Sequence, residues 1–180
     1  NLIKAKELLD RAYDINQNNY TVVHSIAELN IHLAEDEART ELESDKYLNQ
    51  ARQICTDNAR FLDAYGIATL IKVDLIKLER LLKKESSEVV DIELEELIKR
   101  IEKHLDDGLQ NYPGQSELFN LEVTLAKILS DSERVLSALN KSFTANPKKS
   151  YVALRLARCY EEKGNDPQAK IILEQALDHN

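Results

Sequence analysis

The chain of 180 residues is long enough to bury a sizeable core, and its 43% apolar and 31% charged residues are typical of a folded, helix-rich protein. Four Gly and three Pro are too few for an all-β chain, and no apolar run reaches the roughly 18 residues that a membrane span needs. The net charge of −8 argues against a nucleic-acid binder, because neutralising phosphates takes an excess of Lys and Arg. The composition therefore predicts a folded, helix-rich protein that has neither nucleic acid nor a membrane among its partners.

The absence of Met, even as the first residue, suggests a piece of a longer polypeptide. We therefore expect other domains of the same polypeptide among its partners. The two cysteines, Cys55 and Cys159, lie far apart in the chain. This favours two reduced thiols in a cytoplasmic protein over a disulfide or a redox pair.

The stretch 1–58 predicts one and a half helical hairpins. Its first part, 1–19, has the spacing of the second helix of a hairpin whose first helix is missing, and 20–58 predicts a complete hairpin. The apolar and small residues that mark these helices are Ala5, Leu9 and Ala12, then Ile26, Ala27, Leu48 and Ala51.

The stretch 59–115 predicts a third hairpin that carries an insertion at about 72–95. The insertion lengthens both helices, and the polar run from Glu85 to Glu88 predicts the break between them. The longer hairpin either packs its two extensions against each other or offers a docking site to another domain or a second copy. The apolar stripe behind these alternatives consists of Val89, Ile92, Leu94, Leu97, Ile98 and Ile101.

The stretches 116–149 and 150–180 predict two further hairpins, the last of which is the most regular. Gly164 suits the left-handed position that follows a helix end. Asp166 is expected to cap the next helix, and Pro167 fits its first turn.

The hairpins repeat at a constant interval along the chain. Ala169, Leu173 and Ala176 correspond, one interval earlier, to Val135, Leu139 and Ser142, and then to Ile101, Leu105 and Gly108. Pro113 and Pro147 are separated by the same interval, each just beyond a predicted second helix, where a proline stops the helix.

A helix-turn-helix unit of about 34 residues resembles that of the tetratricopeptide repeat (TPR) family. The last hairpin resembles it most, with Leu156 and Ala157 at the Leu-small pair, Tyr160 at the aromatic position and Gly164 at the turn. The resemblance implies a single domain over 1–180, a right-handed α-solenoid of TPR-like hairpins with one elongated, inserted hairpin. It also implies a protein or peptide ligand held in a concave groove.

No pattern in the sequence supports catalysis. Neither a GxxxxGK[ST] nor a GxGxxG loop occurs, and no acidic or Cys partner lies at metal-binding spacing from the histidines His24, His32, His104 and His179. Paired carboxylates such as Asp106 and Asp107 fit solvated helix faces. We therefore expect a protein that is not an enzyme, with no catalytic residues, cofactor or metal.

The family resemblance places the groove on the first helix of each hairpin. Its expected residues are His24, Glu28, His32, Arg60, Asp63, Ile67, Asn120, Thr124, Lys127, Tyr151, Arg155 and Arg158. The C-terminal half of this set is basic and polar, which favours a peptide of acidic or amidic character or a C-terminal carboxylate. The alternative is that Arg155 and Arg158 are solvated or pair with Glu161 and Glu162 on their own helix.

The leading interpretation is a non-catalytic interaction module, and its alternative is a scaffold or oligomerisation arm that uses the inserted hairpin. The irregular early hairpins, the long-helix insertion and the regular final hairpins resemble the helical sensor arm of STAND-type signalling NTPases, many of which act in antiphage defence. That resemblance implies the recognition region of a multidomain regulator.

Overall fold

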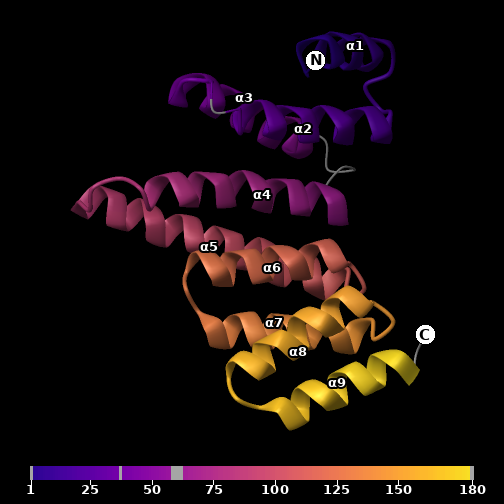
Figure 1. Ribbon diagram of the computed structural model, residues 1–180. Coiled ribbons are helices and arrows are strands. Elements are labelled where there is room, and N and C mark those ends of the chain that lie inside the picture. The colour runs from indigo at the N-terminus through magenta and orange to yellow at the C-terminus, as the bar shows by residue number, and fades with distance from the viewer. Residues whose placement is uncertain (1, 37, 58–62, 179–180) are drawn as a thin grey trace. The chain divides into compact units, whose positions relative to one another are not determined.

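The computed structural model describes residues 2–36, 38–57 and 63–178, which form nine α-helices and no strand (Figure 1). The helices gather into two compact units, residues 1–106 and 107–180. Among the described residues, no helix combines the length and the apolar character required to cross a membrane.

The first unit contains four helices and most of a fifth. They are α1 (Leu2–Ile15), α2 (Tyr20–Ala34), α3 (Glu41–Thr56), α4 (Ala64–Leu81) and the greater part of α5 (Glu88–Asn111). A reciprocal capping box begins α3, because the Thr40 side chain accepts from the Glu43 N–H while the Glu43 carboxylate accepts from the Thr40 N–H. Helices α4 and α5 form the expected elongated hairpin, and the chain between them covers the predicted polar break up to Glu88.

The core of the first unit lies where α2 and α3 pack together with α4. Ala27 on α2 and Ala51 on α3 are fully buried, and such small residues allow the helix axes to approach closely. Larger side chains fill the space around them, namely Ile31, Leu48, Leu70 and Val73.

A buried carboxylate joins three helices of the first unit. Asp74 on α4 is fully buried and accepts two hydrogen bonds of 2.9 Å from the Nε and Nη2 atoms of Arg100 on α5. The Nη2 atom of Arg52 on α3 donates to the same carboxylate. Burying a lone carboxylate is strongly unfavourable, and two guanidinium groups remove most of that cost. Asp74 therefore links the elongated hairpin to α3.

The second unit is built from two hairpins, α6 (Ser116–Ile128) with α7 (Ser132–Ala145) and α8 (Ser150–Glu162) with α9 (Asp166–Asp178). Its core combines residues of all four helices. The repeat positions Leu139, Ser142, Ala169 and Ala176 are all buried, as the repeat interval predicts.

The turn between α8 and α9 confirms one prediction and corrects another. Gly164 has a φ of 71°, in the left-handed region. The side chain that caps α9 belongs to Asn165, whose Oδ1 accepts from the Gln168 N–H at 3.2 Å, so the prediction that Asp166 is the cap was wrong. Asp166 is the first residue of the helix, where its negative charge suits the helix dipole.

The expected all-α fold of helical hairpins, one of them elongated, is confirmed. The repeat boundaries at 1–19, 20–58, 59–115, 116–149 and 150–180 remain a proposal. Three of the proposed units start where a helix starts, at Tyr20 of α2, Ser116 of α6 and Ser150 of α8. The start proposed at 59 lies outside the described residues.

Replacing Asp74 by Asn should lower the free energy of unfolding by about 2–4 kcal/mol, because the change leaves two guanidinium groups without their counter-charge. This loss of unfolding free energy is smaller than that expected for breaking a fully buried ion pair, because the side chains of Arg52 and Arg100 are both partly exposed to solvent. Urea denaturation followed by circular dichroism measures it. Glu95→Gln on α5 is the matched control, because the Glu95–Lys99 pair is 68% exposed on both sides and should leave the midpoint unchanged. Equal midpoints for the two variants would contradict the role assigned to Asp74.

Candidate functional site

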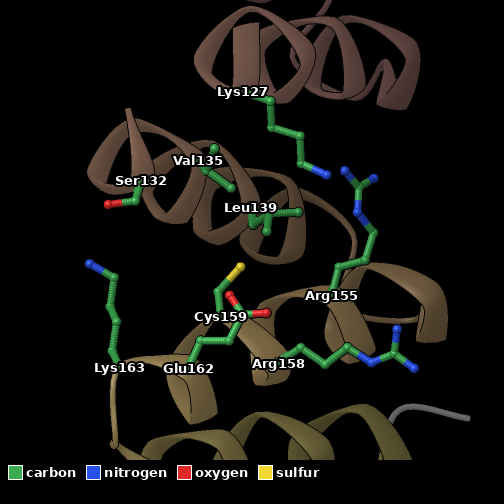
Figure 2. A pocket seen from close by; sticks show the side chains of 9 residues that line it. All are labelled: Lys127, Ser132, Val135, Leu139, Arg155, Arg158, Cys159, Glu162 and Lys163. Carbon is green, nitrogen blue, oxygen red and sulfur yellow. The ribbon is translucent and has the colours of Figure 1, made fainter. Parts of the chain in front are cut away.

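A cavity of about 580 Å³ opens on the second unit between α6, α7 and α8. Figure 2 shows its lining, which consists of Lys127, Ser132, Val135, Leu139, Arg155, Arg158, Cys159, Glu162 and Lys163. One wall is apolar, because Val135 and Leu139 lie one turn apart on the same face of α7. The opposite wall comes from α8, where Arg155, Cys159 and Glu162 recur at helical spacing.

The charge of the cavity is opposite to that of the whole chain. Four cationic side chains and a single carboxylate, Glu162, line it. Figure 2 shows the Lys127 ammonium and the Arg155 guanidinium converging at one end, while Lys163 and Ser132 lie at the other. The site can therefore present several N–H donors to an anion beside an apolar wall.

Two of the four cations are held by neighbouring side chains. Nη1 of Arg155 donates to Oδ1 of Asn120 on α6 at 3.1 Å, and Lys163 is paired with Glu133. Lys127 and Arg158 form no ion pair with any residue that the structure describes. Arg155 is thus oriented in advance by a neutral partner that leaves its charge available.

The pairing of Arg155 and Arg158 with the acidic residues of their own helix, considered as an alternative to the groove, is not observed. Within the described chain neither arginine forms an ion pair with Glu161 or Glu162, and the Arg155 side chain is half-buried against α6. The other half of that alternative, a solvated arginine, agrees with Arg158, which is exposed.

The thiol of Cys159 contributes to the lining as an uncharged group. Burial raises its pKa, and the nearby Glu162 raises it further, while Lys127, Arg155 and Lys163 act in the opposite direction. Figure 2 shows the sulfur between α8 and the Leu139 side chain. The other cysteine, Cys55, is fully buried, and burial raises its pKa to about 11. Both thiols are therefore protonated at neutral pH and are poor nucleophiles.

The structure brings together three of the predicted groove residues in this cavity, Lys127, Arg155 and Arg158. The side chain of Asn120 accepts the hydrogen bond from Arg155, and the Thr124 hydroxyl donates to the backbone carbonyl of Asn120 at 2.9 Å. Tyr151 is 45% exposed on α8 and does not line the cavity.

Most of the predicted groove residues of the first unit that the structure describes have partners within that unit. Asp63 caps α4, accepting from the N–H groups of Tyr65 and Gly66 at 3.1 and 3.0 Å. Glu28 on α2 forms an ion pair of 2.8 Å with Lys72 on α4. His32 is mostly exposed beside Glu35, Ile67 is partly buried on α4, and Arg60 lies outside the described residues.

His24 lies in an aromatic environment on α2. Its ring centroid is 4.2 Å from that of Tyr20 and 5.8 Å from that of Tyr65, and its Nε2 lies 3.7 Å from the Asp63 carboxylate. Burial lowers the pKa of His24, and the nearby Glu28 opposes that effect. The folded state thus favours the neutral imidazole.

The cavity residues that come from α7 and from the end of α8 were not predicted, because the groove was expected on first helices alone. They are Ser132, Val135, Leu139, Cys159, Glu162 and Lys163. Arg155, Cys159 and Glu162 fall on one helical face by their spacing, which was a usable signal. Val135 and Leu139 were identified as repeat positions but were assigned to packing alone.

The sequence matches no protein-family model and no curated protein. Solved structures do match. TTC0263, a thermophilic TPR protein from Thermus thermophilus, superposes with a TM-score of 0.65 at 16% identity, over 98% of this chain and 82% of that chain. The chain has the fold of a TPR protein. MamA matches with a TM-score of 0.59 at 11% identity, over 98% of this chain and 87% of its own. At these identities the likeness concerns the fold alone.

His24 should make the stability of the TPR-like chain depend on pH. Because its folded-state pKa lies below the ordinary 6.5, the unfolded chain takes up a proton near that pH that the folded chain does not. Stability therefore falls as the pH drops from about 6.5 towards the lowered pKa. Urea midpoints at pH 7.5 and 5.5 should differ less for His24→Gln than for the wild type. His32→Gln, at a side chain that is 62% exposed, should retain the wild-type difference. An unchanged pH dependence in His24→Gln would contradict the assignment.

Proposed function

We propose that the chain is a non-catalytic interaction module that binds an acidic segment of a partner protein in the cationic cavity of α6, α7 and α8. The observation that carries the proposal is the convergence of Lys127, Arg155 and Arg158 in one cavity of a chain whose net charge is −8. The TPR-like fold supports it, since stacked helical hairpins offer extended binding surfaces.

The chemistry of the cavity favours a carboxylate beside an apolar side chain. The carboxylate, from Asp, Glu or a chain terminus, accepts charge-assisted hydrogen bonds from the arginines. Asn120 already orients Arg155, so less conformational entropy is lost on binding. Val135 and Leu139 provide the contact for the neighbouring side chain.

The lining argues for binding rather than catalysis. Cys159 is held as a thiol, and no histidine is among the described residues that line the cavity, so neither Cys159 nor Ser132 has an imidazole base beside it. The remaining predicted groove residues are proposed as further binding residues of their own units, Tyr151 on the second unit, and His24 and Glu28 on the first.

The proposal extends to the cellular context. A helical array of this kind fits a cytoplasmic module that serves as the recognition region of a larger regulator. Other domains of the same polypeptide would then be further partners. More specifically, we propose that the chain is the helical sensor arm of a STAND-type defence protein. Expression of the gene's complete coding region with and without the module would test it, through loss of the signalling response.

Reversing two charges in the cavity should abolish partner binding. The variant Arg155→Glu/Arg158→Glu should lose a captured partner and weaken the affinity for the corresponding synthetic acidic peptide by at least about tenfold. Pulldown with mass spectrometry identifies the partner, and fluorescence anisotropy with the labelled peptide measures Kd.

The matched control is Lys148→Glu/Lys170→Glu, which changes the net charge equally at exposed positions that do not line the cavity. It should bind within about twofold of the wild type once salt is near 0.15 M, where distant charges are screened. Equal weakening in both double variants would place the effect in the overall charge and contradict a local site.

A second function is supported by the tip of the elongated hairpin. Leu82, Val89 and Ile92 are 48%, 74% and 53% exposed around the end of α4 and the start of α5. Val89 and Ile92 lie three residues apart on one face of α5, and exposed apolar side chains grouped in this way mark interaction surfaces. This favours self-association through the hairpin.

If the hairpin is an oligomerisation surface, light scattering coupled to gel filtration should give at least twice the monomer mass. Val89→Glu/Ile92→Glu should then restore the monomer, because an unpaired charge cannot be buried at the contact. Leu42→Glu, at an 81% exposed position on α3, is the control and should not change the mass. A monomeric wild type would exclude the scaffold and leave the binding module.

A further inference from the structure

Two exposed apolar side chains lie near the start of α8, beside the cationic cavity but outside it. Tyr151 and Leu154 are 45% and 52% exposed, and neither lines the cavity. Because they are three residues apart on one helix, their side chains are neighbours on its surface. This α8 patch is separate from the apolar wall of the cavity, which Val135 and Leu139 form on α7.

The α8 patch lies on the side of the cavity where two cations converge. Among the cavity residues of α8, Arg155 comes first in the chain, and Tyr151 precedes it by one helical turn. Residues four apart lie on the same face of a helix, one above the other. Figure 2 shows the Arg155 guanidinium and the Lys127 ammonium at the same end of the cavity. An anion held by Arg155 therefore has Tyr151 one turn away along α8.

The side chain of Tyr151 has no role within the chain. Among the residues that the structure describes, its hydroxyl has no hydrogen-bond partner and its ring has no aromatic or cationic partner. Tyr160 on the same helix provides the contrast, since its ring packs against the core and its hydroxyl accepts from Nδ2 of Asn140 at 3.2 Å. An exposed tyrosine offers a large contact area and loses little conformational entropy on binding. Tyr151 is therefore suited to contact with a partner.

The distance along α8 determines the spacing that a ligand needs. Four residues of an α-helix rise about 6 Å, and an extended chain covers that length in about two residues. Residues i and i+2 of an extended chain also point to the same side. An extended segment that runs along α8 can therefore place one side chain on Tyr151 and the side chain two positions away on Arg155.

We propose that the partner segment carries an aromatic residue two positions from its acidic residue, and that Tyr151 selects this aromatic residue. The inference rests on the proposed function of the cationic cavity, because Arg155 and Lys127 hold the acidic residue. An aromatic side chain is favoured over an aliphatic one, since two rings gain from offset or edge-to-face contact beyond the area that they bury. Leu154 adds apolar area beside the ring.

Four short peptides test the spacing on the full chain, with acetylated and amidated ends so that no terminal charge competes for the cavity. Two of them place the residues two positions apart in opposite orders, Gly-Ser-Phe-Ser-Asp-Ser-Gly and Gly-Ser-Asp-Ser-Phe-Ser-Gly. The third, Gly-Ser-Ser-Phe-Asp-Ser-Gly, has the same composition with the two residues adjacent, and the fourth is the first with Ala in place of Phe. ¹H–¹⁵N NMR titration measures each Kd.

One of the two spaced peptides should bind at least about fivefold more tightly than the adjacent and the alanine peptides. The order that binds better gives the direction of the segment along α8. Equal Kd values for all four peptides would overturn the proposal.

Variants of the α8 patch test the role of Tyr151. Tyr151→Ala should weaken the preferred spaced peptide about fivefold and leave the alanine peptide within about twofold, whereas Tyr151→Phe, which keeps the ring, should bind as the wild type does. Leu177→Ala, at a 76% exposed apolar position on α9 outside the cavity, is the matched control and should change neither Kd. An unchanged Kd in Tyr151→Ala would contradict the assigned role. If Tyr151→Ala does not fold, Leu154→Ala should weaken the same peptide.

Arg155→Glu/Arg158→Glu distinguishes failure of this inference from failure of the proposed function. The double variant should weaken all four peptides, because each carries the acidic residue. If the wild type binds all four equally and the double variant binds none, the acidic site stands and the aromatic preference is wrong. If no peptide binds the wild type, or the double variant binds as the wild type does, both proposals are wrong.

Discussion

Close approach of paired helices at small residues is the constraint on which both units depend. Ala27, Ala51, Ala138 and Ala153 are all at most 1% exposed. A larger side chain at these positions would separate helices that are otherwise packed at the density of an organic crystal. Because the helices meet at these alanines, the longer side chains lie on the helix faces to either side of the contact. The cavity of the second unit is one result, with its apolar wall on α7 and its arginines on α8.

Buried polar groups mark where the packing serves something other than the core. Asp74 is fully neutralised by two arginines and joins three helices, which fixes the elongated hairpin in the first unit. Glu122, at a position where the repeat pattern expects a large apolar residue, is 7% exposed and pairs with Lys141 at 2.9 Å. Asn30 has no such compensation from the residues described. A polar core group with internal partners contributes to folding, whereas one without them lowers the free energy of unfolding.

Periodicity and turn residues were sufficient to predict the helices, the break before Glu88 and the left-handed Gly164, because these depend on local backbone preferences. The cap of α9 was predicted one residue too late, since Asn165 and Asp166 are both good caps and the sequence does not choose between them. The link between Asp74 and Arg100 is a tertiary contact between helices, and no helical period reveals it. Arg155 and Arg158 were predicted as groove residues, but Lys163 was not, because only the folded turn brings it to the same cavity.

The net charge of the whole chain limits how an acidic segment could reach the cationic cavity of the second unit. A chain of net charge −8 repels an acidic segment at long range, so the cationic cavity gains little from electrostatic steering. In the proposed binding mode the affinity comes from short-range contacts, in which Asn120 orients Arg155 and the α7 wall contacts an apolar side chain.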